Sequence, residues 1–157
     1  MTTLKIIRTL QVITYLLISS QLLFYLLVLG DALKLVSIEN FMEQRKAVDS
    51  IILVRYKWLY YSSLLICIAA VIVSARKPIS PFFISSAIAL ICLVVDVLIA
   101  VNLNIPINAQ FNSYGEGTGL TDWNAIRLQW LDFIRYRGIS IAIGMLSLII
   151  GLVWDRS

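Results

Sequence analysis

The sequence predicts an all-α fold, a four-transmembrane-helix bundle with helices extended beyond one bilayer face. Hydrophobic residues make up 60% of its 157 residues and the mean hydropathy is +0.89, whereas soluble domains are nearer half apolar. The second observation is a set of four apolar runs, because a helix of about 20 apolar residues crosses a bilayer. These runs lie at residues 10–30, 58–75, 82–101 and 139–154. We therefore expect a single four-helix membrane domain over residues 1–157.

The first apolar run follows Lys5 and Arg8, which is the order found in a signal peptide. Its apolar core is too long for that interpretation, and no small-residue cleavage site follows it cleanly. We expect this run to be retained as the first helix.

The second run is expected to be the last part of a longer helix. A capping sequence begins at Ser37, and neither glycine nor proline interrupts the chain from there to Ala75. Arg45 and Asp49 are four residues apart, so they can pair on one helical face. We expect this charged first half to stand outside the membrane and to be exposed.

The third and fourth runs are expected to be joined through helices that leave the membrane. The third helix should continue beyond its apolar run, with a kink at Pro106, which lacks a backbone donor. The pair Thr121-Asp122 resembles an N-cap for a helix that leads into the fourth run, and Gly138 is expected to soften that helix. The glycine-rich stretch at residues 115–119 is interpreted as a hinge or turn, since its spacing is not that of a phosphate loop.

Basic residues suggest an orientation in the cell membrane. Four spans place both termini on one side, and the short connection there contains Arg76 and Lys77 with no acid. Because short basic loops stay in the cytoplasm, we expect cytoplasmic termini in a multi-pass protein. The raw number of basic residues is larger on the opposite side, which favours the reverse orientation.

The net charge of +4 is explained by cations that flank membrane helices and contact anionic lipid headgroups. No run of lysine and arginine is long enough to indicate nucleic-acid binding. The chain has no histidine, which excludes a bis-histidine haem, a histidine-ligated metal and a Ser-His-Asp triad. Its two cysteines, Cys67 and Cys92, form no C-x-x-C motif. We therefore expect neither a cofactor nor a metal.

The polar stretch between the third and fourth runs contains the candidate ligand-binding residues. Asn104 and Asn108, with Asn112, recur every four residues and would share one helical face. Trp123, Arg127 and Trp130 are spaced four and then three, which also gives one face, and Arg135 follows them. Arg127 would lie between the two indoles or hold an anionic or carbonyl oxygen of a ligand. The alternative is an interfacial aromatic belt with solvated amides.

Two polar residues fall within the apolar runs. Asp96 lies in the third run, where an ionisable side chain is expected to face the bundle interior with a partner. Gln21, in the first run, is the predicted partner. This pair would either fix helix packing or carry a proton.

The same residues give the chain a resemblance to the anthrone oxygenase-like family of small four-helix integral membrane proteins. The resemblance rests on Asn104, Pro106 and Asn108, and it continues in the last third with Trp123, Arg127, Trp130 and Arg135. It implies a pocket for a flat aromatic such as an anthrone or quinol, and oxygenation without metal or flavin. The family pattern has a histidine near the second tryptophan, where this chain has Asp132 and Phe133.

These observations favour a membrane protein that binds a hydrophobic aromatic or quinone-like molecule at the bundle mouth. Two alternatives stay open. One is a homo-oligomeric pore in which the asparagines line a conduit. The other is an accessory subunit of a membrane complex without a catalytic role. A pocket predicts that the polar side chains converge within one protomer.

Overall fold

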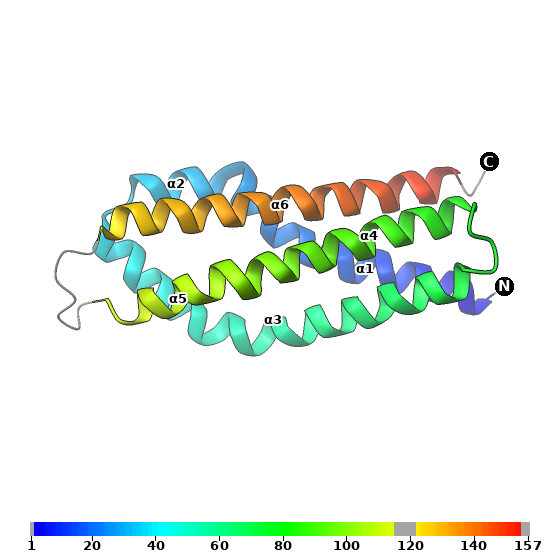
Figure 1. The fold of residues 1–157 in the computed structure, drawn as a ribbon, viewed down its shortest axis with the longest axis horizontal. Helices are drawn as coiled ribbons and strands as arrows, with labels where there is room; N and C mark the ends of the chain where they lie inside the picture. Colours follow the sequence, from blue (N-terminus) through cyan, green and yellow to red (C-terminus); the bar gives the residue numbers. More distant parts are fainter. Residues whose placement is uncertain (1, 115–121, 155–157) are drawn as a thin grey trace.

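The protein is an all-helical bundle of four long, roughly antiparallel helical stretches, as a computed structural model shows for residues 2–114 and 122–154. Both ends of the chain lie at the same end of the bundle (Figure 1). Within the described residues, four helical stretches are long and apolar enough to cross a membrane, namely Thr3–Leu35, Val54–Ser74, Pro81–Asn112 and Trp123–Trp154. They contain or closely match the four predicted runs. The prediction of a multi-pass α-helical membrane protein is therefore confirmed.

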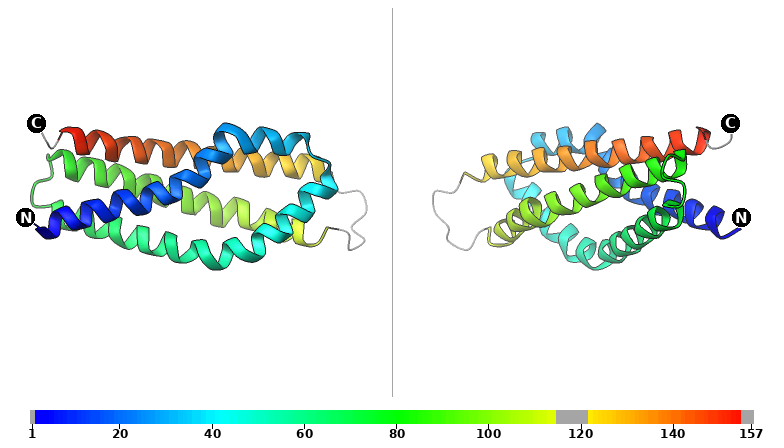
Figure 2. Two further views of the ribbon diagram at one scale, coloured as in Figure 1. Left: turned by 180° about the vertical axis from the view of Figure 1, so that it is seen from behind. Right: turned by 45° about the vertical axis from the view of Figure 1, so that its right-hand side comes forward.

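The first stretch is α1 (Thr2–Phe24), a π-helical turn η1 (Tyr25–Leu29) and α2 (Gly30–Leu35). In the π turn, the Gly30 N–H donates to the Tyr25 carbonyl five residues earlier. A Cβ on Gly30 would lie 2.8 Å from that carbonyl oxygen, so glycine suits this position. Figure 2 shows how the first stretch bends in this region, so that α2 lies beside the first part of α6.

The second stretch is one helix, α3 (Ile38–Ser74), as predicted. The Ser37 hydroxyl accepts a hydrogen bond from the Asn40 N–H and caps its start. The span of α3 that is apolar enough to cross a membrane begins at Val54, so the first part of the helix extends beyond it. A short turn then leads to α4 (Pro81–Ile99), which Ser80 caps through the Phe83 N–H.

The third stretch continues from α4 through a second π turn, η2 (Ala100–Asn104), into α5 (Ile105–Asn112). Pro106 lies two residues after the end of this turn, and a residue without a backbone N–H disrupts the regular α-helical ladder there. The predicted continuation is confirmed, and the irregularity is a π turn that precedes the proline.

The fourth stretch is α6 (Trp123–Trp154), which begins where the Asp122 carboxylate accepts from the Ala125 N–H. The helix runs unbroken through Gly138, so the expected softening there stays a prediction. The absence of a side chain at Gly138 serves close packing, since a Cβ there would lie 3.3 Å from the Leu22 carbonyl oxygen. The glycine-rich stretch at 115–119 lies outside the described residues.

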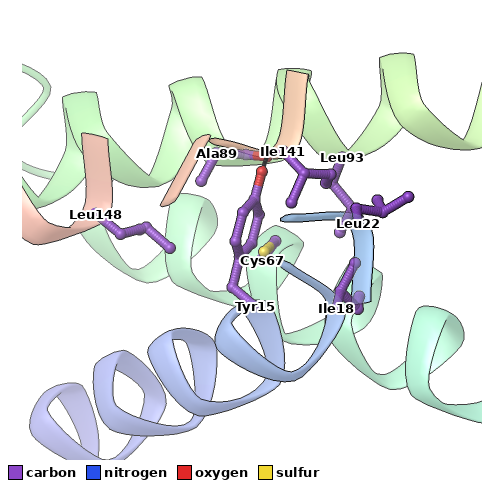
Figure 3. Close-up of a cluster of buried hydrophobic side chains, with 8 residues drawn as sticks. All are labelled: Tyr15, Ile18, Leu22, Cys67, Ala89, Leu93, Ile141 and Leu148. Carbon is purple, nitrogen blue, oxygen red and sulfur yellow. Dashed lines mark hydrogen bonds between the residues drawn. The ribbon is translucent and has the colours of Figure 1, made fainter. Parts of the chain in front are cut away.

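A first core fills the membrane part of the bundle between α1, α3, α4 and α6 (Figure 3). Tyr15 stands at its centre and donates a hydrogen bond to the Ala89 carbonyl over 3.3 Å. Gly144 on α6 makes room for this phenol, because a Cβ there would lie 1.8 Å from the Tyr15 hydroxyl. Buried around Tyr15 are Ile18, Leu22, Cys67, Ala89, Leu93, Ile141 and Leu148.

A second core lies at the opposite end from the termini, where α2, α3, α5 and α6 extend beyond the first core. Its rings meet edge to face, with the Phe41 centroid 5.4 Å from Phe111 and 5.9 Å from Trp130. The other buried members of this core are Leu33, Met42, Ile107, Leu131 and Ile134. The extension is therefore a packed structure with its own apolar interior.

Candidate functional site

A cavity of about 280 Å³ lies at the level where the two cores meet. It is bounded by the end of α1 and η1, by the middle of α3, by η2 and α5, and by α6. Leu22 from the first core and Trp130 and Ile134 from the second core form parts of its wall. The polar and aromatic residues that line it are Gln21, Tyr25, Arg45, Asp49, Tyr56, Lys57, Tyr60, Tyr61, Asn104, Asn108, Trp130 and Arg137.

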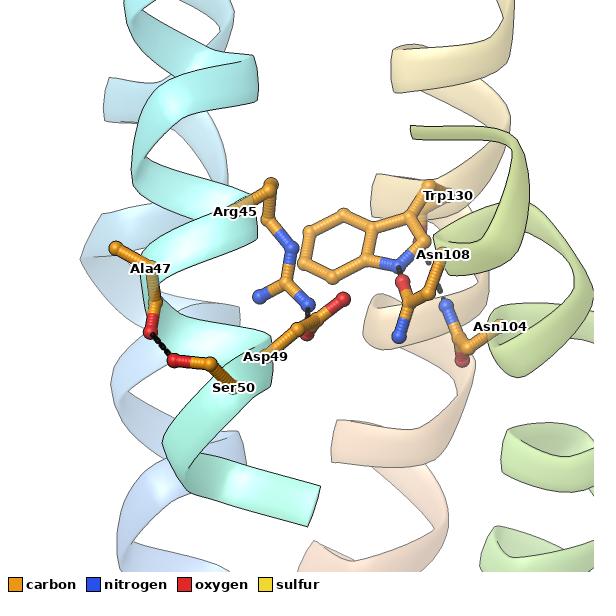
Figure 4. A network of polar contacts seen from close by, with 7 residues as sticks. All are labelled: Arg45, Ala47, Asp49, Ser50, Asn104, Asn108 and Trp130. Atoms are coloured by element: carbon orange, nitrogen blue, oxygen red, sulfur yellow. Dashed lines mark hydrogen bonds and ion pairs between the residues drawn. The ribbon is translucent and has the colours of Figure 1, made fainter. Parts of the chain in front are cut away.

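On the α3 side, an ion pair forms part of the wall (Figure 4). Arg45 donates from Nη2 to Asp49 Oδ1, and both residues are almost fully buried. The Arg45 guanidinium lies 4.5 Å from the centre of the Trp130 ring, which is a cation–π arrangement. Burial raises the pKa of the Asp49 carboxyl above its ordinary value, and Arg45 only partly opposes that shift. The predicted pairing of these two residues is confirmed, whereas their predicted exposure is wrong, because both side chains are buried and the Arg45 guanidinium packs on Trp130.

Opposite this pair, the predicted residues Asn104 and Asn108 form hydrogen bonds with Trp130. Asn108 Oδ1 accepts from Trp130 Nε1 at 2.7 Å, and Asn104 Nδ2 donates to the Trp130 carbonyl at 3.3 Å. Asn104 is only 2% exposed, while Asn112 at the end of the same series is exposed. Asn104, Asn108 and Trp130 thus converge within one protomer, as the pocket interpretation requires (Figure 4).

The inner wall contains a cation that the sequence analysis did not single out. Arg137 Nε donates to Asp96 Oδ1 at 2.7 Å, and Arg137 Nη2 donates to the Tyr60 hydroxyl at 3.2 Å. Asp96 is fully buried, as predicted. The prediction that Asp96 pairs with Gln21 is wrong, because the turn of α6 that bears Arg137 lies against Asp96 on α4. Gln21 lines the cavity instead.

Arg127 lies outside the cavity, so its predicted role in ligand binding is not supported by its position. Its Nη1 donates to the Val36 carbonyl at 2.6 Å, and its Nη2 donates to the Lys34 carbonyl at 3.3 Å. These are carbonyls at the end of α2, which a cation stabilises. The predicted stacking of Arg127 between two indoles is wrong, because its guanidinium lies over Phe41, 5.8 Å from the ring centre.

Two further predicted residues also lie away from the cavity lining. Trp123 packs edge to face on Tyr114, with 5.2 Å between ring centres, near the start of α6. Arg135 is exposed on the outer face of α6. The face of α6 that points inward carries Trp130, Ile134 and Arg137. These residues are spaced four and then three apart, and this helical spacing could have identified Arg137 from the sequence.

The chemistry of the site is that of hydrogen bonding and charge, with aromatic walls. Among the described residues, no group of three histidine, cysteine, aspartate or glutamate side chains is placed to hold a metal ion. The cavity instead offers a buried carboxylate, two guanidinium groups, an ammonium group and three amides. Such a combination of apolar surface and a few convergent polar groups is typical of a small-molecule site.

No protein-family model, curated protein or solved structure matches this chain.

Proposed function

We propose that this membrane protein binds a flat hydrophobic aromatic or quinone-like molecule in the cavity between α3, η2–α5 and α6. The observation that carries the proposal is the convergence of Trp130, Asn104, Asn108 and the Arg45–Asp49 pair on one cavity. Aromatic side chains from Tyr25, Tyr56, Tyr60 and Tyr61 add flat apolar surface around it. Rings favour stacked or edge-to-face contacts with another ring.

The position of the cavity also fits a hydrophobic ligand. The lining includes Tyr61, Val101 and Ile105, which are 57%, 53% and 45% exposed. They lie at the end of the apolar part of the bundle, where α3 and the η2–α5 segment face outward. The proposal therefore predicts that a molecule dissolved in the bilayer enters the cavity between these side chains.

The pore alternative receives less support from the same residues. Pore-lining asparagines would present their amides to a shared axis between protomers. Here Asn104 is buried and is bound to the backbone of α6 in its own chain. An accessory role in a membrane complex has no particular residue in its favour.

The carboxylate–guanidinium pair favours an oxygenase-like activity of the kind that the family resemblance implies. In that proposal Asp49 accepts a proton from the anthrone methylene, and Arg45 stabilises the resulting anion. The anion combines with dioxygen, the peroxide takes the proton back to form a hydroperoxide, and loss of one water leaves the quinone carbonyl. Oxygen uptake with an anthrone as substrate tests it: uptake by the unaltered protein that is lost in Asp49→Asn supports the activity. No uptake by the unaltered protein would leave a binding protein.

Binding itself is tested by filling the cavity. Ala100 in η2 lines it, so Ala100→Phe should weaken the binding of 1,4-naphthoquinone to protein in nanodiscs by about tenfold or more. Ala109→Phe is the matched control, because Ala109 is exposed on α5 and is not part of the lining. Empty nanodiscs give the correction for partition into lipid. Equal affinities in the two variants would contradict the proposal, as would an unaltered protein that binds neither 1,4-naphthoquinone nor 2,6-dihydroxynaphthalene.

A further inference from the structure

Three residues that line the cavity each carry a buried polar atom without a hydrogen-bond partner among the described residues. These atoms are Asp49 Oδ2, Asn104 Oδ1 and Arg45 Nε. Buried polar groups in folded proteins are nearly always paired, so an unpaired group calls for an explanation, such as a bound molecule, water or ion. The two oxygens are acceptors, whereas the guanidinium nitrogen is a donor.

The orientation of both acceptors is fixed by the bonds that their side chains already make. Asp49 Oδ1 takes the Arg45 hydrogen bond, so Oδ2 is directed away from Arg45, toward the side of the asparagines in Figure 4. Asn104 must place its nitrogen on the Trp130 carbonyl, because two oxygens would repel each other there. Its Oδ1 is therefore the atom that stays unpaired. Asp49 and Asn104 are 3% and 2% exposed.

We infer that the cavity selects hydroxylated aromatic ligands over their carbonyl counterparts, with Asp49 and Asn104 accepting hydrogen bonds from ligand hydroxyl groups. This inference rests on the proposed function and specifies its ligand class. A phenolic hydroxyl donates its hydrogen to Asp49 Oδ2, and its oxygen can still accept from Arg45 Nε. A quinone oxygen or a methyl ether has no hydrogen to give, so it leaves both wall oxygens unpaired.

The electrostatics of the wall act in the same direction. The carboxylate of a group whose pKa is raised by burial is more basic than that of an ordinary aspartate, and so accepts a hydrogen bond more strongly. A quinone oxygen placed against Asp49 Oδ2 would set two acceptors face to face. A site that hydrogen-bonds a hydroxyl discriminates strongly against analogues that lack it, because the buried partner is then unsatisfied.

The test compares three naphthalenes of similar size: 2,6-dihydroxynaphthalene, 2,6-dimethoxynaphthalene and 1,4-naphthoquinone. Calorimetric titration into protein in nanodiscs, corrected with empty nanodiscs, should give an affinity for the diol about tenfold or more above the other two. This ranking in the unaltered chain needs no variant. Equal affinities, or tighter binding of the quinone, would overturn the inference while the proposed function stands. Binding of none of the three would contradict the proposed function and the inference together.

Asp49→Asn adds a second measurement. The amide oxygen of the new asparagine can still accept the hydrogen bond from Arg45. Its NH₂ group, a donor, then takes the place of Asp49 Oδ2, an acceptor. The diol should then lose affinity and the quinone should gain it, so that the preference shrinks or inverts. Glu39→Gln removes the same charge from an exposed position on α3 and should keep the original ranking. An unchanged preference in Asp49→Asn would remove Asp49 from the recognition of the hydroxyl.

Discussion

Replacement of Asp96 by leucine should destabilise the protein by about 3 kcal/mol, because Arg137 would keep its charge without its partner. Removing one member of a buried ion pair costs about 3–5 kcal/mol. The lower end applies here, since the Arg137 side chain is 13% exposed and borders the cavity. Its remaining side-chain partner would be the Tyr60 hydroxyl, a neutral acceptor at 3.2 Å.

The double variant Asp96→Leu/Arg137→Leu separates this cause from a simple loss of packing. With both charges gone, an apolar pair fills the same space, and such replacements are often neutral or stabilising. We expect the double variant to be at least about 2 kcal/mol more stable than Asp96→Leu alone. This holds although the double variant lacks the hydrogen bonds that Arg137 donates to Asp96 and Tyr60 in the wild type.

Unfolding can be followed by far-ultraviolet circular dichroism, either as melting in detergent or as titration with dodecyl sulfate in mixed micelles. A loss of about 3 kcal/mol corresponds to a fall in Tm of about 6–12 °C for a chain of this size. Melting of Asp96→Leu within about 2 °C of wild type would show that Arg137 tolerates the loss of its partner. Simple addition of the two single-variant effects in the double variant would show that the two charges are not coupled; either result refutes the predicted cost.

Other predictions concern packing, the extension and pH. Gly144→Ala should lower the free energy of unfolding by about 1–3 kcal/mol, because its Cβ would meet the buried Tyr15 hydroxyl. Gly138→Ala should lower Tm less in the same melting assay, because the atoms nearest to its Cβ would lie at 3.3 Å. Arg127→Ala should speed hydrogen exchange at the end of α2 while leaving the affinity for naphthoquinone nearly unchanged; a selective loss of affinity would return Arg127 to the site. Because burial raises the folded-state pKa of Asp49, protonation favours the folded state, so the Tm of wild type should rise on acidification relative to that of Asp49→Asn. If the Tm of wild type and the Tm of Asp49→Asn change in parallel with pH, the predicted stabilisation by protonation of Asp49 is contradicted.

Local sequence patterns predicted the elements of this fold well. Apolar length located the four spans, and the capping residues Ser37 and Asp122 marked the helix starts as expected. The spacing of Arg45 and Asp49 also predicted their pairing. Each of these inferences depends on residues within one helix, where the geometry of the α-helix fixes which side chains are neighbours.

The wrong predictions about side-chain partners and exposure required the relative rotation or depth of two helices. Arg45, rather than Arg127, stacks on Trp130, because that choice depends on how α3 is turned toward α6. Asp96 meets Arg137 because the two lie at the same depth, which no spacing within α4 reveals. The π turn at residues 100–104 adds to the difficulty, since it breaks the α-helical period just before Asn108.

The two separate apolar cores have a thermodynamic consequence. A ligand in the cavity would touch Leu22 from one core and Trp130 from the other, so it could bind only while both are formed. By linkage, a concentration one hundred times the Kd would add about 2.7 kcal/mol to the stability of the folded chain. Occupancy would therefore make the membrane half and the extension melt as a single cooperative unit.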